Sequence, residues 1–261
     1  LLMLSPQRIE TLDATPPPPA ATLGSWTATI AWYLVVALLG AAALPALVAL
    51  MPSQPALAFG IARTAGVFGF GAIAWWATWA GVDSWRTDSL AALAVILVAA
   101  GAIAGSRRRD AIAAAWSREG WRAEAVFAVL YAAAIALRVS NPDLWTPGYG
   151  GEKPMDFAIL NAVVHADAFP PLDPWFAGGR LNYYYGGFVP VAALAKLTGT
   201  PPAVATNLAV ALWMALTGAG LFALARTLAL VLPGVAESRA TLAGAIATIA
   251  GVGAGNLGIV S

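Results

Sequence analysis

The sequence predicts an all-α fold, a polytopic bundle of transmembrane helices. Three observations predict it: the 261 residues are 60% hydrophobic, only 10% of them are charged, and the mean hydropathy is +0.75. A soluble domain carries about 25% charged residues because its surface faces water. A surface this poor in charge faces lipid instead, so the lipid bilayer is the first predicted partner.

Composition also excludes several classes of function. A net charge of +1 gives no reason to expect nucleic acid as a partner. The absence of cysteine excludes disulfides and thiolate catalysis. With His165 as the only histidine, a metal site built from several histidines is excluded as well. None of this fixes the oligomeric state.

The N-terminal segment, residues 1–25, is predicted to be a proline-rich linker, because four consecutive prolines from Pro16 to Pro19 favour polyproline II. After it, about seven stretches approach the roughly 20 apolar residues that a span needs. Three fall within residues 26–106 and four within 121–261: Trp26–Leu50, Ala56–Gly81, Ser89–Gly105, Trp121–Val139, Tyr183–Leu197, Ala203–Ala225 and Thr241–Val260. The chain begins without Met and stops after an apolar run, so we expect a longer membrane protein with a further C-terminal part.

Orientation follows from the connection over residues 107–120, around which five arginines crowd: Arg107, Arg108, Arg109, Arg118 and Arg122. The positive-inside rule makes this connection cytoplasmic. The loop over residues 140–182 then faces the exterior of the cell membrane. The same count of seven spans places Arg226 and Arg239 outside, against the rule. Arg63 and Arg138, near predicted span ends, are expected to extend to the headgroups.

The exterior loop is rich in proline and glycine, and its many aromatic residues indicate an ordered segment. Within it a short helix is predicted over residues 154–166, since Pro154 suits the first helical position. Apolar residues recur there at helical spacing: Phe157, Leu160, Val163 and Val164.

Asp156 is the first candidate for chemistry. Its local pattern has a simpler explanation, because a carboxylate in the first turn stabilises a helix N-terminus. The alternative is a general base or a metal ligand. Glu152 lies four residues earlier, and the two carboxylates could share a divalent cation such as Mg²⁺ or Mn²⁺.

A second cluster extends from Pro170 to Gly187. Arg180 suits either a phosphate or lipid headgroups. Tyr183, Tyr184 and Tyr185 suit interfacial anchoring, but consecutive helical residues project about 100° apart, so at least one tyrosine is expected to point into the bundle. His165 near the end of the loop helix suits a structural or a catalytic role.

These motifs resemble a known family. Asn141-Pro142-Asp143, Glu152 to Phe157, Asp173-Pro174-Trp175 and Asn182-Tyr183-Tyr184-Tyr185 are similar, in type and order, to the uncharacterised "YYY" family of very hydrophobic membrane proteins. That family is in turn similar to the GT-C glycosyltransferases, whose long exterior loop carries an acidic motif and a surface helix. The resemblance covers roughly residues 138–225 and implies a GT-C-like module over 121–261.

The resemblance implies transfer of a sugar from a polyprenyl-phosphate donor on the exterior face. Asp156 or Glu152 would then be the base, with Asp143 also eligible. It implies a wider set of substrate-binding candidates: Lys153, His165, Asp173, Arg180, Asn182, Tyr183, Tyr184 and Tyr185. Two other functions stay open at this point, a transporter or flippase of a lipid-linked substrate and a non-catalytic assembly subunit.

Overall fold

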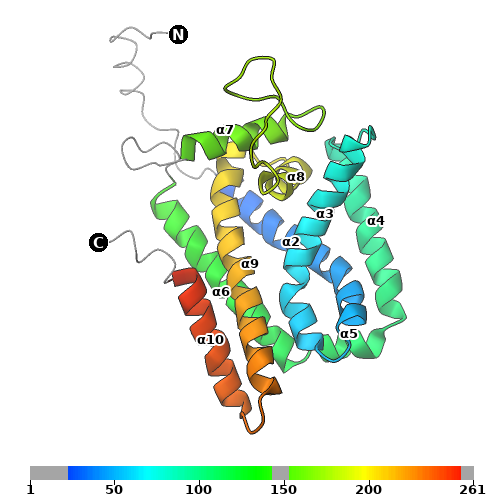
Figure 1. Cartoon of the computed structure of the whole chain (residues 1–261), viewed down its shortest axis with the longest axis vertical. Coiled ribbons are helices and arrows are strands. Elements are labelled where there is room, and N and C mark those ends of the chain that lie inside the picture. Colours follow the sequence, from blue (N-terminus) through cyan, green and yellow to red (C-terminus); the bar gives the residue numbers. More distant parts are fainter. Residues whose placement is uncertain (1–22, 143–152, 254–261) are drawn as a thin grey trace.

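The computed structural model describes residues 23–142 and 153–253, and this part of the chain is all-helical apart from one isolated β-bridge (Figure 1). Five helices are long and apolar enough to cross a membrane: α2 (Leu23–Leu50), α3 (Pro55–Trp79), α4 (Thr87–Ser106), α6 (Arg118–Ser140) and α9 (Pro202–Val231). Shorter helices are α5 (Arg109–Ala115), α7 (Lys153–Val164), α8 (Phe188–Thr198) and α10 (Glu237–Gly253). The predicted membrane helix bundle is confirmed. Most of the predicted linker, residues 1–22, lies outside the described residues.

Helix α8 corrects the predicted count of seven spans. Its 11 residues extend about 16 Å at 1.5 Å per residue, roughly half of a 30 Å hydrocarbon core. Gly199 ends the helix in the left-handed conformation (φ 65°), and Pro202 begins α9 directly afterwards. The apolar stretch over 183–197 is therefore a short helix that contacts α2, α3, α4, α7 and α9, and not the predicted span. Of the predicted last span over 241–260, α10 is described only as far as Gly253.

Hydrogen bonds at both ends of α9 show the direction in which this helix runs relative to α6. Near the start of α9, Asn207 accepts a hydrogen bond from Arg138 Nε at the end of α6 (2.7 Å). Near the other end, Arg226 Nε and Arg122 Nη1 both donate to Thr241 Oγ1 at 3.4 Å. Helices α6 and α9 are therefore antiparallel along their whole length.

This arrangement also corrects the predicted positions of Arg226 and Arg239. Both lie at the end of the bundle that carries α5 and the arginine-rich connection, here called the basic end (Figure 1). The conflict with the positive-inside rule disappears, because α8 does not reverse the chain across the membrane. The bond from Arg138 to Asn207 joins α6 to α9, an interhelical role that suits an amide near the start of a span.

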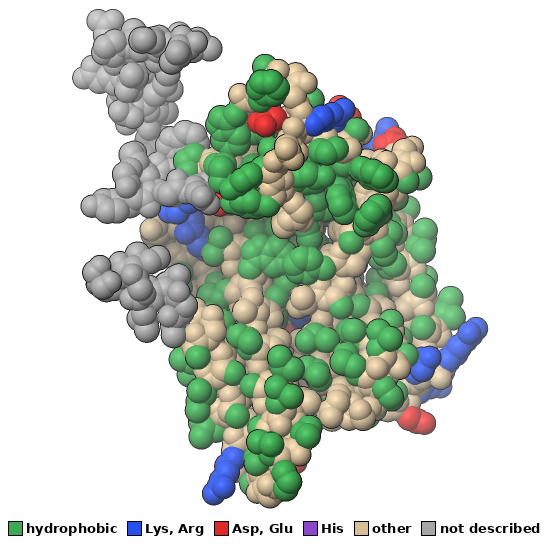
Figure 2. All heavy atoms as spheres, in the orientation of Figure 1, with side chains coloured by type: hydrophobic (Ala, Val, Ile, Leu, Met, Phe, Trp, Pro, Cys, Tyr) green, Lys and Arg blue, Asp and Glu red, His purple; other side chains and the backbone are tan. Residues whose placement is uncertain are grey.

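The surface has the distribution that a bilayer requires. Figure 2 shows charged side chains mainly towards the two ends of the long axis, with a broad band of hydrophobic side chains between them. Small residues bring the helices close together beneath this band. A methyl group on Gly66 of α3 would overlap the backbone of Leu39 on α2, so only glycine fits at this crossing.

One ion pair lies inside the bundle. Arg63, the ninth residue of α3, donates to Glu124 of α6 through Nε (3.0 Å) and Nη2, and Tyr33 of α2 donates its hydroxyl to the same carboxylate (2.6 Å). The guanidinium carbon also lies 4.3 Å from the ring centre of Phe127. The Arg63 and Glu124 side chains are only 13% and 15% exposed. Arg63 thus pairs within the bundle and does not extend to the headgroups as predicted.

Replacing Arg63 with methionine is expected to lower the free energy of unfolding by about 2–4 kcal/mol, because Glu124 would remain buried without its cation. Denaturant titration in detergent micelles, followed by circular dichroism, measures this. The double variant Arg63→Met/Glu124→Gln should recover part of the loss. Arg239→Met at an exposed position is the matched control, and a loss no larger than that of the control would contradict the structural role of the pair.

The position of the α9–α10 turn is tested by single cysteines, since the chain has none of its own. We expect Ser106→Cys and Ser238→Cys to react with a membrane-impermeant maleimide from the same side of oriented vesicles. Ala177→Cys, in the loop between α7 and α8, should react from the opposite side. Labelling of the cysteines at 238 and 177 from the same side would instead support the predicted topology of seven spans, in which the stretch over 183–197 crosses the membrane.

Candidate functional site

Helix α7 lies across the end of the bundle opposite the basic end (Figure 1). Pro154 stands at its second position and Asp156 in its first turn, as the proline rule and the helix dipole favour. Ile159, Leu160 and Val163 are buried and contact the core of the bundle. The predicted loop helix is confirmed, with its end two residues earlier than expected.

Two side chains from the bundle hold the C-terminal end of α7. Trp85, just before α4, donates Nε1–H to the carbonyl of Val163 (2.9 Å), and Lys196 of α8 donates to the carbonyl of Val164 (2.9 Å). These carbonyls belong to the last turn of α7, where intrahelical donors run out. Burial lowers the pKa of Lys196, while the nearby Asp167 carboxylate acts in the opposite direction. No pattern in the sequence indicated either contact.

The proline-rich segment after α7 forms a hairpin over residues 171–181. Leu181 N–H donates to the carbonyl of Pro171 (2.8 Å), and Asp173 N–H donates to that of Gly179 (3.0 Å). Asp173 Oδ1 accepts hydrogen bonds from the backbone N–H groups of Trp175 (2.8 Å) and Phe176 (3.2 Å). Asp173 therefore shapes the turn by bonding its own following backbone.

Arg180 fastens the base of this hairpin. Its Nη1 donates to the carbonyl of Pro170 at 2.7 Å and lies 3.4 Å from that of Ala168. Neither the predicted phosphate contact nor extension towards headgroups is needed to explain its position. The guanidinium remains exposed, but its observed contacts are to backbone carbonyls.

The three tyrosines precede α8 and do not belong to it. Tyr183 and Tyr184 are exposed, with ring centres 4.1 Å apart. Tyr185 packs inward, stacked on Phe169 at 5.9 Å and edge-on to Trp75 at 6.3 Å. One tyrosine of the three thus points into the bundle, as expected, although the reason is not helical geometry. Asn182 is exposed beside them.

An open groove of about 620 Å³ lies between α7 and the hairpin. One side is formed by a face of α7 that carries Phe157 and Asn161, and the other by Asp173 and Trp175. Asp156, Arg180 and the tyrosines are not among the described residues that line it. The structure therefore does not bring the predicted base into one cavity with the predicted phosphate ligand.

Helix geometry explains why Asp156 is absent from the groove. The lining residues of α7 centre on Ala158, and Asp156 lies two positions away, about 200° around the axis. It shares the bundle-facing side with Leu160 and Val163, which follow at spacings of four and seven. Asp156 is half-buried there.

Helix α7 contacts α9 at the end of the bundle where Arg138 of α6 is bonded to Asn207 of α9. Asn207 Nδ2 also donates to the carbonyl of Pro142 (3.3 Å). This end of the bundle therefore carries a carboxylate, a cation and an amide. Arg138 was predicted only to extend to the headgroups, and the sequence offered no other sign of its association with Asn207.

Other predicted residues have simpler surroundings. His165 is exposed, and its Nδ1 lies 2.9 Å from the carbonyl of Asn161 one turn earlier, which fits a structural role. Lys153 is half-buried as the first residue of α7. Glu152 and Asp143 lie outside the described residues. Within residues 23–142 and 153–253 no three acidic or histidine side chains gather as a metal site would require, so the proposed Mg²⁺ or Mn²⁺ pair of Asp156 and Glu152 stays a prediction.

The arrangement defines a multi-pass membrane protein with a surface helix over one end of its bundle. Residues 69–261 match the model of a family described as uncharacterized membrane protein (DUF2298), and the chain belongs to this family. The comparison with curated proteins found no match. The comparison with solved structures found none either.

Proposed function

We propose that this chain is a GT-C-like membrane glycosyltransferase module that takes a sugar from a polyprenyl-phosphate donor on the face opposite the basic end. One observation carries the proposal: Asp156 in the first turn of α7 lies on the bundle-facing side of this helix, which contacts α9 at the end of the bundle where Arg138 is bonded to Asn207. A carboxylate and a cation at a membrane surface are the two groups that transfer from a lipid phosphate requires. The order of motifs along the chain supports the same function.

In the proposed reaction Asp156 accepts the proton of an acceptor hydroxyl. The hydroxyl oxygen forms a bond to the anomeric carbon of the donor sugar, and the bond from that carbon to the phosphate oxygen breaks. The leaving polyprenyl phosphate carries the electron pair and a growing negative charge. Arg138 lies on the same end of the bundle as Asp156 and suits this charge better than Arg180, whose Nη1 contacts carbonyls of the hairpin.

The groove between α7 and the hairpin supports a sugar as part of the substrate. Its volume of about 620 Å³ falls in the usual range for small-molecule sites, about 300–1,000 Å³. Phe157 and Trp175 offer apolar ring faces, while Asn161 and Asp173 offer polar groups. Because Asp156 faces away from it, the groove would hold a part of the donor or acceptor remote from the reacting carbon.

A transport function receives less support. Transporters bind substrates at the midplane on interrupted helices. The Arg63–Glu124 pair does lie inside the bundle, but α2, α3 and α6 continue unbroken past it. Glu124 accepts hydrogen bonds from Arg63 and Tyr33, and the Arg63 guanidinium lies over the ring of Phe127. The pair therefore fits a structural contact between helices.

Asp156→Asn is expected to lower sugar transfer at least 100-fold, because the amide cannot accept the hydroxyl proton. Membranes with the full-length protein would be supplied with a panel of radiolabelled polyprenyl-phosphate sugars, and release of polyprenyl phosphate would be measured. Asp167→Asn, an exposed carboxylate on the same side, is the matched control. Unchanged transfer when Asp156, Glu152 and Asp143 are all replaced would disprove the proposal.

Two single substitutions distinguish the role of Arg138 from that of Arg180. Arg138→Gln is expected to reduce kcat by about 10- to 1,000-fold, since it removes charge stabilisation of the leaving phosphate. Arg180→Gln should change kcat less than fivefold and mainly loosen the hairpin, which limited proteolysis would detect. The reverse order of the two effects on kcat would assign the phosphate to Arg180.

A further inference from the structure

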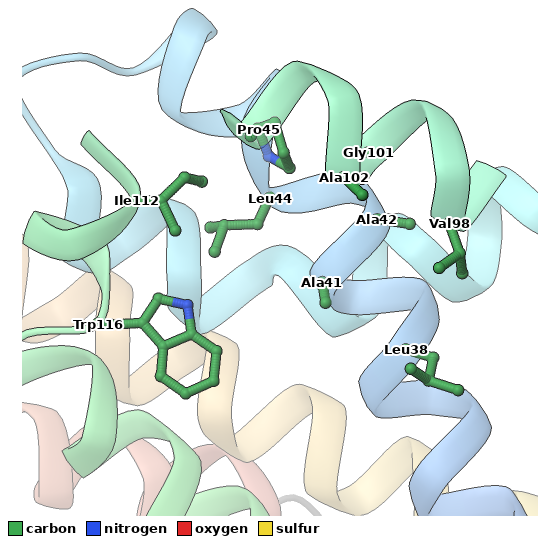
Figure 3. Close-up of a pocket in the computed structure, with 11 residues that line it drawn as sticks. Leu38, Ala41, Ala42, Leu44, Pro45, Val98, Gly101, Ala102, Ile112 and Trp116 are labelled. Atoms are coloured by element: carbon green, nitrogen blue, oxygen red, sulfur yellow. The ribbon is translucent and has the colours of Figure 1, made fainter. Parts of the chain in front are cut away.

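A second cavity lies near the basic end, far from α7. It is an apolar groove of about 230 Å³ between α2, α4 and α5. Figure 3 shows Leu38 and Leu44 on α2, Val98 on α4, and Ile112 and Trp116 at α5 around it. Leu38, Ala41 and Ala102 at its edge are exposed apolar residues of membrane-spanning helices, so an occupant is expected to enter from the membrane.

Small side chains create this groove. Ala41, Ala42, Gly101 and Ala102 leave a gap where α2 crosses α4 (Figure 3), and Gly101 lies against the backbone of Ala42. Pro45 adds a second cause, because it has no N–H to donate to the Ala41 carbonyl one turn earlier. The lining extends over two turns of α2, from Leu38 to Pro45, and two turns of α4, from Val98 to Gly105, which suits a chain of methylene groups.

A basic cluster lies in the turn that joins α4 and α5, two of the helices that form the groove. Arg107, Arg108 and Arg109 fall between groove residues on α4 and α5, and all three are exposed. Among the described residues none of the three forms a salt bridge. The one carboxylate next to them in the chain, Asp110, is exposed as well, so the cluster keeps a net positive charge.

We propose that this groove binds one anionic phospholipid from the leaflet at the basic end. An acyl chain occupies the groove, and the phosphate of the headgroup lies against Arg107–Arg109. Charge complementarity selects an anionic headgroup over a zwitterionic one. Trp116, which lines the groove and is 46% exposed, is placed where an indole favours the interface between headgroups and chains.

The test measures lipid retained by the full-length protein. The protein in mild detergent is mixed with equal amounts of phosphatidylglycerol and phosphatidylcholine, and bound lipids are counted by native mass spectrometry. Wild type is expected to retain phosphatidylglycerol at least fivefold over phosphatidylcholine, with the preference falling as salt is raised. Equal retention of the two lipids by wild type would overturn the proposal.

Two kinds of variant distinguish binding of the lipid headgroup from binding of its acyl chain. Arg107→Gln/Arg108→Gln should reduce phosphatidylglycerol retention at least fivefold, whereas Arg86→Gln/Arg239→Gln removes the same charge from other exposed positions and should leave it unchanged. Ala102→Trp fills the groove and should reduce retention with the arginines intact. Equal effects of the two arginine pairs would overturn the headgroup assignment, and full retention by a folded Ala102→Trp variant would overturn the acyl-chain site.

A second copy of this protein is the competing occupant of the groove. Its presence would appear as a dimer that dissociates in Ala102→Trp without any preference for phosphatidylglycerol. That outcome also contradicts the lipid proposal. The arginine variants change only exposed side chains, so they keep the proposal testable if Ala102→Trp fails to fold.

Discussion

The arrangement of the bundle depends on one constraint, the short length of α8. A helix of 11 residues cannot cross a hydrocarbon core of about 30 Å. It is instead held inside the bundle, where buried Trp32 of α2 donates Nε1–H to the hydroxyls of Thr198 and Thr200, each at 3.1 Å. Because the chain leaves α8 on the side where it entered, α9 starts beside α7 and ends among the arginines of the basic end.

The charged groups follow from this topology. Arg226 is 4% exposed and Arg122 is half-buried, yet both contact Thr241 at the basic end, where water and headgroups are near. Arg63 and Glu124 lie further from helix ends, so they need each other and Tyr33 to satisfy their polar atoms. Each charge inside the bundle is thus either close to a surface or matched by a partner on a neighbouring helix.

The sequence predicted what depends on local pattern. Pro154 and the apolar spacing that follows it predicted α7, and the long apolar runs predicted the five long helices. The partners of Arg63 could not be predicted, since Glu124 lies 61 residues away and Tyr33 lies 30. Nor could α8 be distinguished from a span, because hydropathy measures apolar content and both a lipid-facing and a protein-buried helix are apolar.

The candidate site also shows that residues close in sequence can have different surroundings in the fold. Sequence order placed Asp156, Asp173 and Arg180 on one loop, but the folded loop gives them different surroundings. Asp173 and Arg180 bond backbone atoms of the hairpin, while Asp156 faces the bundle from the other side of α7. A base must lie within hydrogen-bond reach of the proton that it accepts. In the proposed transfer, the acceptor would therefore have to approach the bundle-facing side of α7, and the outer groove would hold a part of the substrate remote from Asp156.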